Sequence, residues 1–359
     1  MSDENRPPQV GQKRPSEDSA FTKPPRKKAQ RADEWTSKGR HIGRSIHAFA
    51  NFAQIMVAGI QLDKDLALSP DGDIEKYPFE DRLKYSIYSQ VLKALPELEG
   101  GLARNTINTS SLNTICGSIQ FGANMARSDD IKGLKCAVVD WIAHPVLGLK
   151  PPIPRNQMGP RGFNHDVTGR YLCPAGLEWD VVKKDLQAKR MTVPTDQWPI
   201  FIYANDAYDP ESPWDGFLRG RLLVNAFKHV FTSPSSVDNS GRATKSSNSE
   251  LHGMTKVTIA SIVYIATLVR FCLGDQSTLA RSNTVENYQA FYNGLLMFLS
   301  HPDERENVNE LLSWWNKQVF PTSVDSIRAP TANSPLENML KLRMRRNAMQ
   351  ALGNSGLVN

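Results

Sequence analysis

One short segment, residues 161–170, brings together side chains that could do chemistry. It contains Arg161, Asn164, His165, Asp166 and Arg170, interspersed with glycines. A histidine next to a carboxylate can serve as a base or a metal ligand, glycines let the backbone approach a ligand, and two arginines could hold an anion. The segment therefore supports one functional hypothesis, an enzyme or a protein that binds a small ligand or an anion.

A structural role for this segment is the simpler interpretation. The adjacent side chains of His165 and Asp166 diverge on a strand or a helix, and paired metal ligands usually have another spacing, such as i and i+4. We therefore expect an arginine and a histidine that pin an irregular loop. The sequence contains no phosphate-binding loop, nucleophile elbow or dinucleotide fingerprint, and its four cysteines form no C-x-x-C pair. It predicts no catalytic residue, no metal site and no cofactor.

The N-terminal residues 1–34 carry a more specific signal. Lys13 and Arg14 are followed, after eleven residues, by Arg26, Lys27 and Lys28. Two basic clusters at this separation are typical of a bipartite nuclear import signal, whose charges bind acidic pockets on the import receptor. The segment is rich in proline and poor in large apolar residues, so we expect a disordered tail. The alternative is a basic tail that only increases solubility.

The positive charge is concentrated at the two ends of the chain. The net charge is +6, of which residues 1–45 contribute +5 and residues 336–359 contribute +3, which leaves −2 for residues 46–335. The second basic cluster comprises Lys341, Arg343, Arg345 and Arg346. A folded domain that binds DNA through a basic face usually carries the excess itself. Any binding to nucleic acid is therefore expected through the tails, without sequence specificity and with strong salt dependence.

Apolar residues recur at steps of three and four along most of residues 42–319, which predicts helices. Eight stripes follow this rule: 42–60, 83–95, 112–125, 131–142, 217–231, 257–269, 288–299 and 302–319. Ser128 to Asp130 and Asn283 with Glu286 have the spacing of helix caps for the fourth and seventh of these helices. No convincing pair of alternating strands accompanies them. The sequence predicts an all-α, multi-helix globular body.

Other segments depart from this helical pattern. Residues 145–214 hold ten of the 23 prolines and eight aromatic residues, which predicts an ordered but irregular insertion with short strands around Ile200 to Tyr203. Residues 232–250 are expected to form a mobile surface loop, and residues 322–359 a flexible basic tail. The apolar run 257–269 is shorter than the roughly 20 residues of a membrane span, so we expect a buried core helix and no membrane partner.

Several short motifs resemble an uncharacterised domain family that recurs in many proteins of mushroom-forming, basidiomycete fungi. They are residues 162–166, 168–170, 172–174, 198–199, 213–214, 221–224, 231–236, 252–255 and 311–316. The resemblance runs from Arg40 to Pro321 and excludes the tails. It implies a fungal, intracellular protein in which residues 40–321 form one domain, and it brings no activity or functional residue with it.

Taken together, these observations favour a non-enzymatic nuclear interaction protein. Its expected partners are the nuclear import receptor and, through the basic tails, chromatin proteins or nucleic acid. The competing hypothesis is the enzyme, or the small-ligand or anion-binding protein, that uses residues 161–170.

Overall fold

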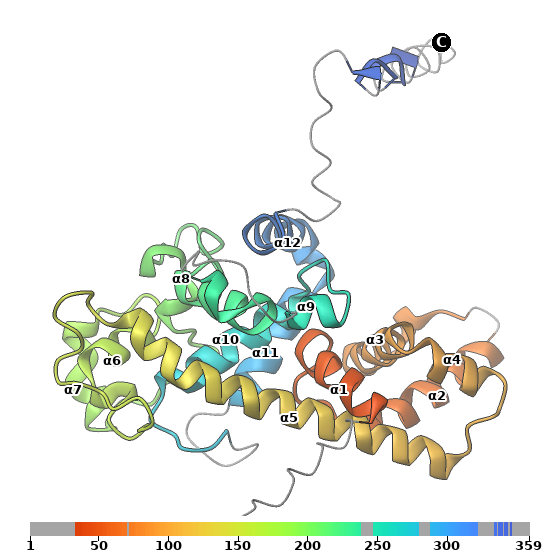
Figure 1. Cartoon of the computed structure of the whole chain (residues 1–359), viewed down its shortest axis with the longest axis horizontal. Helices are drawn as coiled ribbons and strands as arrows, with labels where there is room; N and C mark the ends of the chain where they lie inside the picture. The colour runs from red at the N-terminus through yellow and green to blue at the C-terminus, as the bar shows by residue number, and fades with distance from the viewer. Residues whose placement is uncertain are drawn as a thin grey trace, which may run out of the picture.

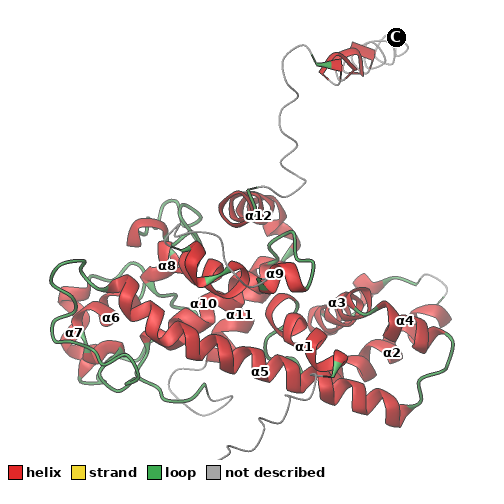
Figure 2. Cartoon of the chain, in the orientation of Figure 1, coloured by secondary structure: helices red, strands yellow, loops and turns green. Residues whose placement is uncertain are grey.

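The computed structural model describes residues 33–69, 72–237, 247–279 and 288–321, together with scattered positions between 334 and 346. Every regular element in these residues is a helix, and none of them belongs to a strand (Figure 2). The all-α prediction is confirmed. The predicted import residues Lys13, Arg14, Arg26, Lys27 and Lys28 lie outside the described residues, as do Asn283 and Glu286.

One long helix, α5 (Thr109–Ile142), runs along the length of the body (Figure 1). Its 34 residues correspond to about 51 Å. Asn108 caps it by accepting a hydrogen bond from the Ser111 N–H at 2.8 Å. The prediction of two helices with a cap at Ser128 was wrong, because the Asp130 carboxylate is buried against Arg44 of another helix instead of capping a new one. Polar residues alone do not end a helix when tertiary partners satisfy them.

The N-terminal half of α5 packs with four shorter helices. These are α1 (Glu34–Ser45), α2 (Phe52–Leu68), α3 (Phe79–Ala94) and α4 (Pro96–Ala103), which share one hydrophobic cluster. The predicted single helix over 42–60 was wrong, because the chain turns between Ser45 and Asn51 and Asn51 caps α2. Pro96 ends α3 as predicted, and it opens α4 at a position where its missing N–H costs nothing.

Helices α1 and α5 approach each other closely along a seam of small residues. A Cβ at Gly122 would overlap the carbonyl oxygen of Thr36, and one at Gly39 would overlap that of Ile119. Glycine is required at these two positions because the backbones of the two helices are in direct contact. The seam fixes α1 against the middle of the long helix.

The C-terminal half of α5 packs with a second and larger hydrophobic cluster. Its helices are α6 (Asp166–Leu172), α8 (Arg221–Phe227), α10 (Ile259–Leu273), α11 (Tyr288–Ser300) and α12 (Arg305–Val319). Helix α7 (Trp179–Gln187) forms a small third cluster with Cys173, and the short α9 (Asn248–Leu251) lies against the helical turn that follows α8. Helix α10 occupies the centre, and all of its residues from Ala260 to Leu273 are buried. The buried core helix predicted from the run 257–269 is confirmed. Among the described helices, none is long and apolar enough to cross a membrane.

The insertion over 145–214 is irregular, as predicted, and it contains α6, α7 and short 3₁₀ turns. The strands expected around Ile200 to Tyr203 are absent from this described stretch, where Ile200–Ile202 forms a 3₁₀ turn. The reason is local, since the Tyr203 N–H donates to the Ile200 carbonyl at 3.0 Å and curls the chain. The described part of the expected loop 232–250 also holds helical turns, Pro234–Ser236 and α9.

A buried polar node joins the two clusters. Arg44 of α1 donates two hydrogen bonds to Asp130 of α5, at 2.8 and 2.7 Å, and the hydroxyl of Tyr264 from α10 donates to the same carboxylate at 2.6 Å. The side chains of Arg44 and Asp130 are only 2% and 7% exposed. The backbone N–H of Ala48 donates to the hydroxyl of Tyr292 in α11 at 3.2 Å. These contacts tie α1 to the second cluster.

Candidate functional site

The guanidinium of Arg161 from the predicted polar segment is fully buried and does not face a ligand site. Its three nitrogens donate to the backbone carbonyls of Gln157, Cys272 and Arg155 at 2.9, 2.6 and 2.7 Å. Burial lowers the pKa of Arg161. The contacts hold residues 155–161 against the end of α10, which is a structural role.

The next two polar side chains also bind backbone. Nδ1 of His165 accepts a hydrogen bond from the Val167 N–H at 3.1 Å and so caps α6, which leaves the proton on Nε2, 2.8 Å from the Pro151 carbonyl. Asn164 donates to the Gly159 carbonyl at 3.0 Å and to Asp275 at 3.4 Å. The histidine is therefore held by both ring nitrogens and has none left for a metal or a substrate.

Asp166 and Arg170 lie at the surface on α6, apart from the buried Arg161. Asp166 accepts a hydrogen bond from the indole N–H of Trp179 at 2.8 Å, and Arg170 lies 3.5 Å from Asp180 and 3.8 Å from Asp166. The five side chains thus do not converge on one point. Among the described residues, no group of histidine, cysteine, aspartate and glutamate could hold a metal ion.

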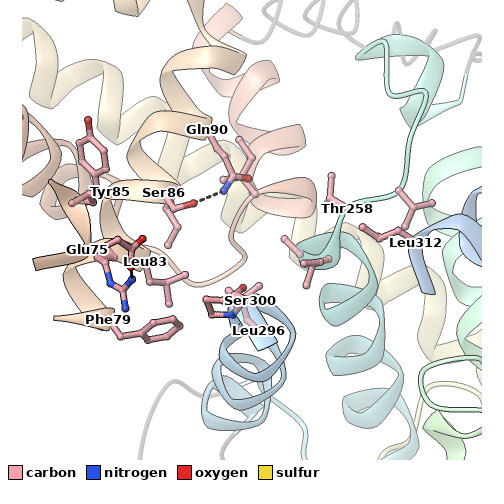
Figure 3. Close-up of a pocket in the computed structure, with 18 residues that line it drawn as sticks. Glu75, Phe79, Leu83, Tyr85, Ser86, Gln90, Thr258, Leu296, Ser300 and Leu312 are labelled. Carbon is pink, nitrogen blue, oxygen red and sulfur yellow. Dashed lines mark hydrogen bonds and ion pairs between the residues drawn. The ribbon is translucent and has the colours of Figure 1, made fainter. Parts of the chain in front are cut away.

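A cleft of about 620 Å³ opens between the two hydrophobic clusters (Figure 3). Phe79, Leu83 and Ser86 of α3 line one side, and Leu296 and Ser300 of α11 line the other. The cleft is mainly apolar, and most of its polar groups already have partners within the chain. Gln90 donates to Ser86 at 3.1 Å, Thr258 donates to the Ser45 carbonyl at 2.7 Å, and Glu75 forms an ion pair with Arg82. This cleft is a seam between two packed units.

A second concavity is built from the irregular insertion and has a different character. We call it the aromatic groove; it has a volume of about 390 Å³ and is lined by Ala175, Asp196, Gln197, Trp198, Tyr203, Tyr208, Pro213, Trp214, Phe217 and Phe298. The insertion supplies all of these residues except Phe217, which follows it, and Phe298, which comes from α11. Six of the ten side chains are aromatic.

The six aromatic rings of the groove contact one another in a continuous series. Trp198 stacks on Phe217 with centroids 4.9 Å apart, Trp214 stacks on Phe298 at 5.5 Å, and Tyr203 meets Tyr208 edge to face at 5.0 Å. Phe217 and Tyr203 are buried. Trp198, Trp214 and Tyr208 are half-buried, so each presents part of its ring to the groove.

Backbone hydrogen bonds hold these rings in place. The Ala175 N–H donates to the Trp198 carbonyl and the Ile200 N–H donates to the Cys173 carbonyl, both at 2.8 Å. These two bonds fix the segment that carries Trp198. The Ala204 N–H donates to the Gly216 carbonyl at 2.8 Å and closes the loop that carries Tyr208 and Trp214. The indole N–H groups of Trp198 and Trp214 form no hydrogen bond with another described residue. They remain free to donate to a ligand.

The surroundings of the aromatic groove are acidic. Residues 191–218 contain five acidic residues, Asp196, Asp206, Asp209, Glu211 and Asp215, and no lysine or arginine. The two nearest cations along the chain are already paired, Arg190 with Asp185 at 2.7 Å and Arg219 with Glu310 at 2.8 Å. Of the five carboxylates, that of Asp196 lines the groove itself, and Asp206 interacts with the charge of Arg221 just beyond the stretch. The stretch of chain that supplies most of the groove is therefore negatively charged, on a body that is close to neutral. The absence of lysine and arginine from residues 191–218 can be read directly from the sequence. The contacts between the aromatic rings cannot, because they join residues that are far apart in the chain.

The fold and this groove define an all-α protein with an acidic, aromatic-lined concavity. Residues 121–320 match a family of unknown function, DUF6698, and the chain belongs to that family. The predicted membership in an uncharacterised domain family is confirmed, although the match begins well after Arg40, where the predicted resemblance began. No curated protein and no solved structure matches the chain.

Proposed function

We propose that this protein is a non-enzymatic nuclear interaction protein whose body binds basic, proline-containing peptide segments in the aromatic groove. The basic tails direct it to the nucleus and add non-specific affinity for chromatin or nucleic acid. The observation that carries the proposal is the set of three half-buried rings, Trp198, Tyr208 and Trp214, inside a stretch of chain with five acidic residues and no cation.

The chemistry of the groove matches that of an extended proline segment. Proline has no N–H, so such a segment offers only carbonyl acceptors and apolar ring faces to its partner. The indole N–H groups of Trp198 and Trp214 supply donors, and the exposed ring faces supply stacking surfaces. Aromatic-lined grooves with this combination recognise proline-rich peptides in other folds. The carboxylates around the groove would select lysine or arginine beside the prolines.

The binding proposal is tested with a labelled peptide of alternating proline and lysine residues, titrated into the full-length protein and followed by fluorescence anisotropy. Trp214→Ala is expected to weaken binding by about 30-fold, because a buried aromatic anchor at an interface contributes about 2 kcal/mol. Trp141→Ala is the matched control, since Trp141 is a half-buried tryptophan on α5 outside the groove. Equal affinities of the two variants, with circular dichroism showing both folded, would contradict the proposal.

The nuclear part of the proposal is measured in cells with a fluorescent fusion of the full chain. Replacement of Arg26, Lys27 and Lys28 by alanine removes one of the two basic clusters and should leave the fusion in the cytoplasm. An undiminished nuclear signal would show that these residues do not direct import.

A further inference from the structure

The N-terminal tail of the chain has the composition that the aromatic groove would bind. Residues 6–15 read Arg-Pro-Pro-Gln-Val-Gly-Gln-Lys-Arg-Pro, so three prolines and three cations fall within ten residues and no acidic residue interrupts them. The prolines complement the stacked rings, and the cations complement Asp196, which lines the groove, and the other carboxylates of residues 191–218. This inference rests on the proposed function of the groove.

The tail is also tethered within reach of the groove. The first described residue, Asp33, precedes α1, and the turn after α1 is hydrogen-bonded to Tyr292 of α11. Helix α1 adds about 18 Å and the six residues from Tyr292 to Phe298 add about 9 Å, so a path along these two helices measures at least about 27 Å. An extended chain spans about 3.3 Å per residue, which places Pro15 within about 60 Å of Asp33. Pro24 and Pro25 reach at most about 30 Å, which leaves almost no slack over this path, so they are less well placed than residues 6–15.

We infer that residues 6–15 dock in the aromatic groove of the same chain and hold Lys13 and Arg14 away from the import receptor. Docking would then compete with import, because Lys13 and Arg14 form the first of the two basic clusters of the predicted signal. A partner peptide that occupies the groove would release the tail, so that partner binding and nuclear import would be coupled through a single site.

A tethered ligand raises the concentration of free peptide that is needed to fill its site. Short flexible tethers give effective concentrations of about 1 mM. If the free segment binds with a dissociation constant of about 0.1 mM, the attached tail should weaken the apparent affinity for an added peptide by about 10-fold. A variant whose tail no longer binds the groove should therefore bind the added peptide about 10-fold more tightly than the unaltered protein.

The test compares three full-length proteins in their affinity for a labelled synthetic peptide of residues 5–16. The first is unaltered, the second has Pro7, Pro8 and Pro15 replaced by alanine, and the third has Pro24 and Pro25 replaced by alanine as a control. All three keep every charge, so a difference cannot arise from net electrostatic attraction. We expect about 10-fold tighter binding by the second protein alone, and loss of binding when Trp214→Ala is added to it.

The possible outcomes separate this inference from the proposed function. Equal binding of the peptide by all three proteins would overturn the docking of the tail and leave the groove's proposed function intact. Tighter binding by both proline variants would assign the docking to the tail as a whole and overturn the choice of residues 6–15. Absence of binding in all three, together with no binding of the proline and lysine peptide, would overturn both proposals.

Discussion

Replacement of Asp130 by asparagine tests whether the buried node joins the two clusters as the structure indicates. Asp130 accepts two hydrogen bonds from Arg44 and one from Tyr264, each between 2.6 and 2.8 Å. Asparagine has nearly the same shape but no charge. The guanidinium of Arg44, with a side chain only 2% exposed, would then lack a counter-charge inside the protein. Its Nη1 already has no hydrogen-bond partner.

The expected cost follows from the burial of both groups. Removal of one partner from a buried ion pair costs about 3–5 kcal/mol, because the remaining charge is left uncompensated. Replacement of the whole node by apolar residues should cost less, since no buried charge or hydroxyl is then left unpaired. The triple variant Arg44→Met, Asp130→Leu and Tyr264→Phe is therefore expected to be more stable than Asp130→Asn alone.

Equilibrium unfolding in urea, followed by circular dichroism, measures both variants against the parent protein. The transition midpoint of Asp130→Asn should fall by about 1–2 M with little change in slope. Asp129→Asn is a matched control, because Asp129 is an exposed neighbour whose single ion pair with Arg40 lies at the surface, and it should change stability by less than about 1 kcal/mol. A loss below about 1 kcal/mol for Asp130→Asn, or a triple variant less stable than that single one, would refute the reasoning.

Two further predictions concern the junction around α1. Gly122→Ala should destabilise the protein by about 1–3 kcal/mol in spite of better helix propensity, because its Cβ would overlap the Thr36 backbone. Gly117→Ala on the same helix is the control, since its Cβ would meet nothing within 4 Å and should stabilise the protein by up to about 1 kcal/mol. Thermal unfolding distinguishes the two variants, and equal shifts of the melting temperature would contradict the close contact of α1 and α5. Burial lowers the pKa of His47 to about 4, and burial with the charges of His252 and Arg44 lowers that of His41 to about 4. The unfolded chain therefore binds more protons than the folded chain between about pH 6.5 and pH 4. The free energy of unfolding should decrease as the pH is lowered through this window, by about 2 kcal/mol per histidine at pH 5 relative to pH 8. Urea midpoints measured from pH 8 to pH 5 check this, and a flat profile would show that the rings are not buried as neutral groups.

The candidate site illustrates how far residue patterns alone can lead. Residues 161–170 form a candidate site in the sequence because five polar side chains lie close together. In the structure, Arg161 instead donates hydrogen bonds to three backbone carbonyls, one of them from Cys272 in α10. The aromatic groove depends equally on distance in the sequence, since Trp214 stacks on Phe298, which comes from α11. No local pattern encodes either contact.

The sequence by itself determined the helical class, the buried core helix α10, the end of α3 at Pro96 and the separation of basic tails from a neutral body. These features depend on periodicity, proline geometry and charge, which act over a few residues at a time. Only the tertiary structure decided that α5 continues through Ser128, that α1 and α2 separate, and that the rings of the insertion form a groove. Each of these outcomes depends on a partner from another element, namely Arg44 for Asp130, Tyr292 for the turn after α1, and Phe298 for Trp214.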